Sequence, residues 1–100
     1  MTQNKEIGCY ILYSKKISKY YVGVCQENLS ERIEKHNSGF YGKKSYTVIT
    51  NDWELYLFIP TKTYRMALAV ERKIKSMKSR RYIKNLTKYP EMIEKIIKSL

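Results

Sequence analysis

The first apolar positions of the chain form two short runs, residues 7–13 and 20–25, with the polar residues 15–19 between them. Both runs are rich in β-branched and aromatic side chains, which favour strands. The connection is too short for a crossover, so the pattern predicts an antiparallel hairpin. A third run of the same kind, residues 53–59, is closed by Pro60 and predicts a third strand.

Helix signals follow the hairpin and the third strand. Asn28 is a suitable N-cap with Glu31 three residues later, and Gly39 is placed to end this helix. Its inward face is marked by Leu29 and Ile33. The stretch 40–51 has no helical period and is predicted to be a loop.

Three more helices are predicted in the second half of the chain. Thr63 caps a long helix whose apolar stripe recurs at helical spacing: Ala67, Val70, Ile74 and Met77. After a break at Ser79, residues 80–86 predict a short helix. A final amphipathic helix, residues 90–99, begins at Pro90. We expect its apolar side to pack on its own domain: Met92, Ile93, Ile96 and Ile97.

The predicted order is β-β-α-β-α-α-α, an α+β fold in which a small three-stranded antiparallel sheet is flanked by helices. One hundred residues provide for one domain, with its core in residues 7–86. No apolar run approaches the ~20 residues of a membrane span. The polar start, residues 1–6, lacks a signal segment, so a cytoplasmic location is expected. Cys9 and Cys25 lie in apolar runs and are predicted to be free, buried thiols.

The net charge of +11 is unevenly distributed. Residues 1–61 carry eight basic and six acidic side chains, whereas residues 62–100 carry twelve and three. Seven basic residues and no acid lie between positions 72 and 84. A solvated helix normally mixes charge signs, so this run indicates an anionic partner. Nucleic acid fits better than a membrane, because no helix carries a large apolar face opposite the charge.

Two tyrosines and a pair of basic residues are candidate chemical groups. Arg32 and His36 are four residues apart and therefore share one helix face, at the edge of its buried side. A guanidinium suits phosphate oxygens, and an imidazole can donate to a phosphate or pass a proton. Tyr10 and Tyr21 lie in the two paired strands. A tyrosine hydroxyl has a pKa of ~10, so it ionises only when a nearby cation or metal ion stabilises the charge. Each of these features alone also fits ordinary surface or core residues.

Glu71 is the most informative single residue, because it is the only acid between Glu54 and Glu91. A hard cation such as Mg²⁺ takes oxygen ligands and often needs only one or two protein carboxylates. The alternative for Glu71 is an ordinary ion pair with Lys75 at i,i+4.

Taken together and in this order, these residues resemble the GIY-YIG nuclease domain, over residues 7–86. The first motif corresponds to Gly8-Cys9-Tyr10, with Cys in place of Ile, and the second to Tyr21-Val22-Gly23. The family's Arg, His and metal-binding Glu correspond to Arg32, His36 and Glu71. The family also tends to carry an Asn near the end of the domain, for which Asn85 is the candidate. Three segments most resemble the small stand-alone bacterial members: residues 10–16, 36–39 and 74–80.

The resemblance implies a metal-dependent endonuclease that hydrolyses DNA with one Mg²⁺ or Mn²⁺ on Glu71. It implies that Tyr10 takes or relays a proton from the attacking water, that Arg32 holds charge on the phosphate, and that Tyr21 and His36 assist. Which Tyr or His is the base stays open. The DNA contacts expected from the basic run are Lys73, Lys78, Arg80, Arg81, Lys84 and Asn85.

Two other functions remain possible on sequence alone. One is a nucleic-acid-binding module without catalysis, and the other is an interaction domain whose basic charge is incidental. The strand state of the DNA and the pathway, repair or restriction, are open. A monomer is expected rather than a dimer, and Tyr82 and Tyr89 are possible platforms for single-stranded bases.

Overall fold

The computed structural model of the chain describes residues 6–42 and 45–100. Its elements follow the predicted order, with one short addition: β1 (Gly8–Ser14), β2 (Lys19–Cys25), α1 (Leu29–Ser38), η1 (Tyr46–Ile49), β3 (Glu54–Pro60), α2 (Tyr64–Met77), α3 (Arg80–Lys88) and α4 (Glu91–Lys98). The polar start of the chain, residues 1–5, and residues 43–44 of the expected loop lie outside the described residues. The α+β fold with an antiparallel sheet is therefore confirmed.

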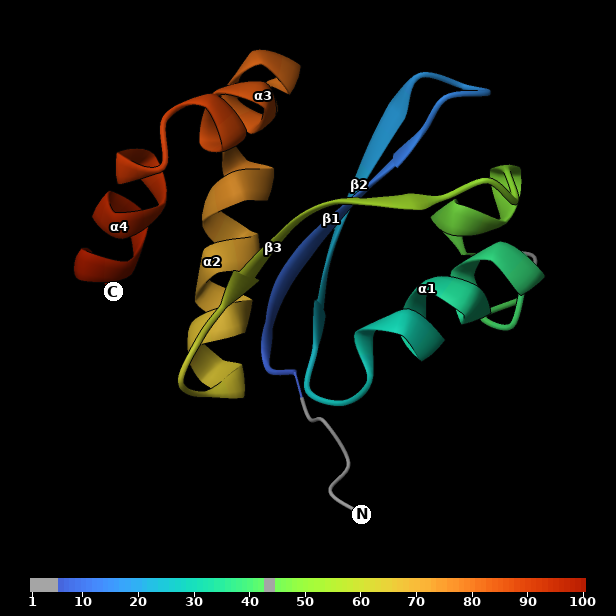
Figure 1. Cartoon of the computed structure of the whole chain (residues 1–100), viewed down its shortest axis with the longest axis horizontal. Helices are drawn as coiled ribbons and strands as arrows, with labels where there is room; N and C mark the ends of the chain where they lie inside the picture. Colours follow the sequence, from blue (N-terminus) through green and yellow to red (C-terminus); the bar gives the residue numbers. More distant parts are fainter. Residues whose placement is uncertain (1–5, 43–44) are drawn as a thin grey trace.

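The three strands form one sheet in the order β2-β1-β3. The hairpin pairs Tyr10 with Gly23 and Leu12 with Tyr21, so the tight 15–19 turn sets the register. In Figure 1 the strands cross the middle of the molecule, with α2, α3 and α4 on one side and α1 with η1 on the other. Both edges of the central strand β1 are therefore paired, and helices cover both of its faces.

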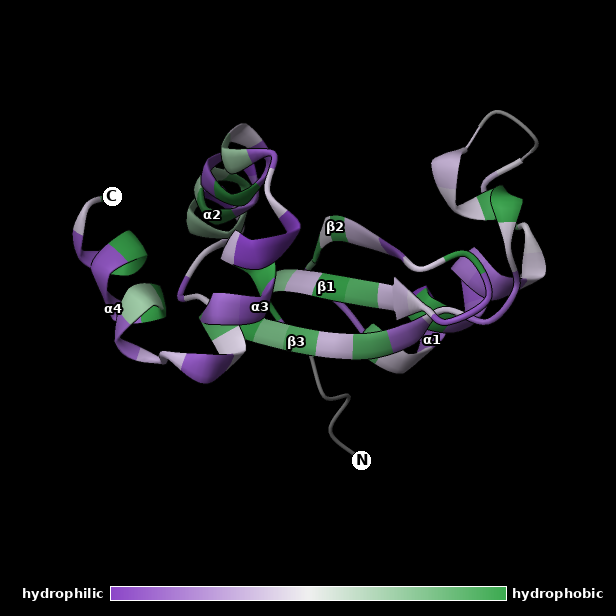
Figure 2. Cartoon of the chain, turned by 90° about the horizontal axis from the view of Figure 1, so that it is seen from above, coloured by the Kyte–Doolittle hydropathy of each residue, from purple (hydrophilic) through white to green (hydrophobic). Residues whose placement is uncertain are grey.

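The alternation of side chains along β1 divides the core into two clusters. Cys9 and Ile11 point to the cluster under α2, α3 and α4, which also holds Val70, Leu86 and Ile96. Tyr10 and Leu12 point to the opposite cluster, with Leu29 and Trp53. Figure 2 shows apolar stretches along β1 and β3 and hydrophilic stretches on α3. Because successive side chains of a strand point to opposite faces, the single strand β1 packs against both helix layers.

The predicted ends of the helices are explained by their caps. The side chain of Asn28 accepts from the backbone N–H of Glu31, and Gly39, with a φ of +74°, ends α1. Thr63 caps α2 and Ser79 caps α3 in the same way. Between them Lys78 ends α2 with a φ of +47°, a conformation that favours glycine.

Two details of the sequence prediction are refined by tertiary contacts. The stretch 40–51 contains the 3-10 helix η1, which is held by a hydrogen bond from Trp53 Nε1 to the carbonyl of Thr47 at 2.8 Å. The apolar side of α4 packs on the first core cluster, as expected. Cys9 and Cys25 are both free and buried. Among the described residues, no helix has the length and apolar character needed to span a membrane.

Candidate active site

Tyr10 is the centre of a hydrogen-bonded cluster that joins β1 to α1. Its side chain is fully buried, and its Oη lies 2.7 Å from His36 Nε2. From one turn earlier on α1, Arg32 Nε donates to the same Oη at 3.4 Å. Three of the residues predicted for the site therefore contact one another.

The hydrogen bonds of this cluster can be assigned a direction from its one obligate donor, Arg32, because the roles of the His36 ring nitrogens depend on the tautomer. Arg32 can only donate, so the hydroxyl oxygen of Tyr10 accepts from it and the single Tyr10 proton is left for His36 Nε2. Assigned in this way, His36 carries its own proton on Nδ1, which lies 2.8 Å from Thr47 Oγ1. Thr47 in turn lies 3.1 Å from the hydroxyl of Ser45. The result is a continuous chain from Arg32 through Tyr10 and His36 to Thr47.

His36 is buried, with only 3% of its surface exposed, rather than lying at the edge of the buried side of α1. The sequence could not show this, because the residues that cover it come from the 40–49 stretch: Thr47 contacts Nδ1, and the Tyr41 ring lies 4.7 Å from the imidazole, centre to centre. Burial, and secondarily the charge of Arg32, lowers the pKa of His36 to about 4. The imidazole is therefore neutral near pH 7 and can accept a proton at Nε2.

The second motif places Tyr21 and Gly23 beside this cluster. The Tyr21 ring centre lies 6.3 Å from that of Tyr10 and 5.0 Å from that of His36. A Cβ added at Gly23 would lie 2.6 Å from both Cζ and Oη of Tyr10, so only glycine fits opposite that side chain. Burial is the main cause that raises the pKa of both tyrosines above the ordinary value, and both are protonated at neutral pH.

Glu71 reaches the same region from the other layer of the molecule. It lies on α2, which packs against β1 and β2. Its charge contributes to raising the pKa of Cys9, on the α2 side of the sheet, and of Tyr21, on the α1 side. Lys75 connects the two groups, because its Nζ lies 3.2 Å from Glu71 Oε2 and 5.9 Å from the centre of the Tyr21 ring. The candidate site therefore straddles the edge strand β2.

The donor atoms of this site suit a divalent metal ion that is bound together with a substrate. Within residues 6–42 and 45–100, no group of three or more His, Cys, Asp or Glu side chains forms a ready-made metal site. Glu71 offers one carboxylate, and about a fifth of the Glu71 side chain is exposed. Mg²⁺ and Mn²⁺ accept such a site when phosphate oxygens and water complete the ligand set.

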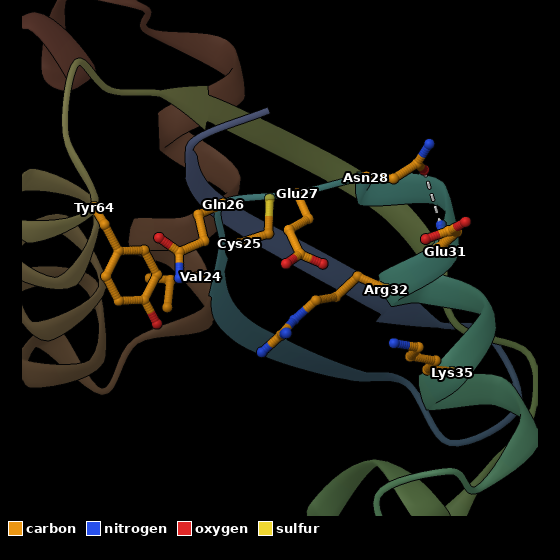
Figure 3. A pocket seen from close by; sticks show the side chains of 9 residues that line it. All are labelled: Val24, Cys25, Gln26, Glu27, Asn28, Glu31, Arg32, Lys35 and Tyr64. Carbon is orange, nitrogen blue, oxygen red and sulfur yellow. Dashed lines mark hydrogen bonds between the residues drawn. The ribbon is translucent and has the colours of Figure 1, made fainter. Parts of the chain in front are cut away.

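A cavity of about 110 Å³ lies between α1 and the beginning of α2. Figure 3 shows Arg32 and Lys35 extending into it from α1, with Tyr64 on the opposite side. The guanidinium of Arg32 therefore faces open space while its Nε contacts Tyr10. This arrangement leaves the remaining N–H groups available to an anion.

The basic run separates into two faces in the structure. Lys75, Lys78 and Arg80 line a groove beside β2, whereas Lys73 lines another with Tyr82 and Lys95, next to α4. Arg81 and Lys84 are exposed on α3, and Asn85 is half-buried there. Among the described residues, the side chain of Asn85 has no hydrogen bond to the tyrosine cluster. The six predicted DNA contacts are thus not on one surface.

Sequence reasoning missed two residues of the site, Thr47 and Tyr41. Thr47 is buried and bonds His36. The Tyr41 ring lies beside Arg32 and His36, and its hydroxyl is buried and has no hydrogen-bond partner among the described residues. Both lie in the stretch without a helical period. Their one sequence signal is the presence of aromatic and apolar side chains in a stretch that is predicted to be a loop.

One known protein family matches most of the chain. The model of the GIY-YIG catalytic domain matches residues 6–86, and the chain therefore belongs to the GIY-YIG family. Its domains are generally nucleases that use a divalent metal ion and act on DNA. No curated protein and no solved structure matches the chain.

Proposed function

We propose that the protein is an endonuclease that hydrolyses DNA phosphodiester bonds with one Mg²⁺ or Mn²⁺ held by Glu71. The observation that carries this proposal is the hydrogen-bonded chain from Arg32 through Tyr10 to His36, placed across β2 from a single carboxylate. A bound metal ion would supply charge neutralisation at the phosphate and the leaving oxygen.

The proton path follows from the assigned hydrogen bonds. Tyr10 takes a proton from the attacking water at Oη while its own proton moves to His36 Nε2. The raised pKa of Tyr10 supports a relay, because a free tyrosinate would be costly in this buried place. In the assigned network, the neutral His36 has Nε2 as its acceptor. It is therefore the proton acceptor in this proposal.

The remaining groups stabilise and position the phosphate. Arg32 carries a fixed positive charge next to Tyr10 and faces the cavity, so it can neutralise charge that builds on the phosphorus oxygens. Tyr21 lies between His36 and Lys75 and can hydrogen-bond a phosphate oxygen or the attacking water. We also propose that the protein acts in the cytoplasm as a monomer.

The test is cleavage of labelled single-stranded and double-stranded DNA in Mg²⁺, Mn²⁺ or EDTA. Glu71→Gln should abolish metal-dependent cleavage, and Tyr10→Phe should lower the rate by roughly 10²–10⁴-fold because it removes the proton relay. Glu91→Gln, a change of the same size at an exposed position on α4, is the matched control and should retain activity.

Full activity of Glu71→Gln would contradict the metal role. If the wild-type protein binds DNA in a salt-sensitive way but never cleaves it, the alternative function, a non-catalytic nucleic-acid-binding module, would replace the proposal. The ion pair between Lys75 and Glu71 would then be a permanent structural contact.

A further inference from the structure

A basic groove runs along β2, between that strand and the junction of α2 and α3. Its cavity measures about 290 Å³, and its lining includes four basic residues and no acid. The lining includes Lys19, Tyr46, Lys75, Lys78 and Arg80. Such a lining favours a polyanion, because it gathers positive charge, and among the described residues only Lys75 of the four is paired with an acid.

Lys75 connects this groove to the candidate active site. Lys75 lines the groove and also pairs with Glu71. Lys75 follows Glu71 on α2 at a spacing of four residues, so the two share one helix face. Lys78 is the residue that ends α2, and it lines the same groove as Lys75. A DNA strand with one phosphate at Glu71 could place its next phosphates at these two lysines and then at Arg80.

The groove also contains an aromatic surface. Tyr46, at the start of η1, stacks on Tyr21 with an angle of 17° between the ring planes and 6.1 Å between the centres. Tyr46 remains 45% exposed, and it lines the groove. A base can stack on such a ring only if it has left the duplex, because paired bases already stack on their neighbours.

We infer that the groove holds a single-stranded DNA segment next to the scissile phosphate, with an unpaired base stacked on Tyr46. This inference rests on the proposed nuclease function and adds its substrate class, a DNA with single-stranded character at the cut. It moves the expected stacking platform from Tyr82 and Tyr89 to Tyr46. It also assigns the phosphate contacts to the residues of the basic run that line this groove: Lys75, Lys78 and Arg80.

The first test compares two faces of the protein with equal loss of charge. Binding of a fluorescent single-stranded oligonucleotide is measured by anisotropy in EDTA at several salt concentrations. The double variant Lys78→Gln and Arg80→Gln should lower the slope of log K against log salt by about 1.4, which corresponds to two lost phosphate contacts. The control, Lys73→Gln with Lys95→Gln, lies on the α4 side and should keep the wild-type slope.

The second test concerns the ring of Tyr46. Tyr46→Ala should weaken binding of the single strand about tenfold or more, whereas Tyr46→Phe should bind as the wild type does. Tyr89→Ala is the control, since Tyr89 is 42% exposed, close to the exposure of Tyr46, but lies at the end of α3. Blunt duplex DNA should show little change with any of these variants.

Two outcomes would overturn the inference. The first is an equal reduction of the salt slope by both double variants, and the second is an unchanged affinity of Tyr46→Ala for the single strand. Circular dichroism melting of each variant separates a binding defect from unfolding. Because binding is measured without metal, a protein that never cleaves DNA could still pass these tests, so the two proposals fail separately.

Discussion

At the scale of single residues, Thr47 controls which nitrogen of His36 carries the proton. It is buried, it does not face open space, and its Oγ1 accepts from His36 Nδ1 in the assigned network. An imidazole has two neutral tautomers, and the bond at one nitrogen decides which is present. Thr47 is therefore a positioning residue, which keeps Nε2 free to accept the proton of Tyr10.

Replacing Thr47 by Val keeps the volume and removes the acceptor. We expect kcat to fall roughly 10-fold or more with little change in KM, because substrate contacts are not altered. Thr47→Ser should restore most of the rate. Nitrogen NMR of the His36 ring gives an independent measurement: the wild type should show the Nδ1–H tautomer, and Thr47→Val a mixture. An unchanged tautomer in Thr47→Val would contradict this role.

The sequence predicted part of this site and not the rest, for a geometric reason. The spacing of Arg32 and His36 is local, so helix geometry alone placed them on one face. The bond between Tyr10 and His36 spans 26 positions and depends on how α1 packs on the sheet. Thr47 was invisible because no local pattern connects it to His36.

At the scale of elements, the strands and helices were predicted almost completely, since period and caps are local signals. The 3-10 helix η1 was not, because tertiary bonds hold it: Asn37 bonds the backbone of Trp53 with both its amide atoms, and Trp53 bonds Thr47. Similarly, helix geometry separates Lys73 from Lys75, but only the packing of α2 shows which of them faces the site.

Lys78 combines two conflicting demands at the end of α2. It has a φ of +47°, where glycine is favoured, yet its side chain lines the basic groove. Lys78→Gly should raise the free energy of unfolding by about 0.5–1 kcal/mol and weaken nucleic-acid binding. Urea denaturation and anisotropy measure the two effects.

The control for this prediction is Lys78→Ala. It removes the same charge without relieving the left-handed conformation, so it should weaken binding equally and leave the protein no more stable. If Lys78→Gly is less stable than Lys78→Ala, the conformational argument is wrong.

At the scale of the whole molecule, stability should fall on mild acidification because of His36. Its folded pKa of about 4 lies below the ordinary 6.5, so only the unfolded chain takes up the proton between these values. The contribution of His36 to the free energy of unfolding is thus fully present above pH 6.5. It declines as the pH falls to 4, by an amount on the order of 2–3 kcal/mol. Urea titrations at pH 7.5, 5.5 and 4.5 measure this decline.

His36→Gln is the comparison for the acid effect, because it cannot titrate. Its stability should change less over the same pH range. Asp52 acts in a lower window, since hydrogen bonds from Ser14 and Thr50 hold its pKa at about 2. Its contribution is present above its ordinary pKa and is lost only as the pH falls toward 2. An equally steep decline in His36→Gln between pH 6.5 and 4 would exclude His36 as the cause.

The division of the core into two clusters, one on each face of the sheet, has a consequence for ligand binding. Tyr10 and its partners belong to the cluster under α1, whereas Glu71 and Lys75 extend from a helix that rests on the other cluster. A phosphodiester that touches both sets would act as a cross-link between the two layers on opposite faces of the sheet. Substrate affinity and resistance to unfolding would then share the same contacts.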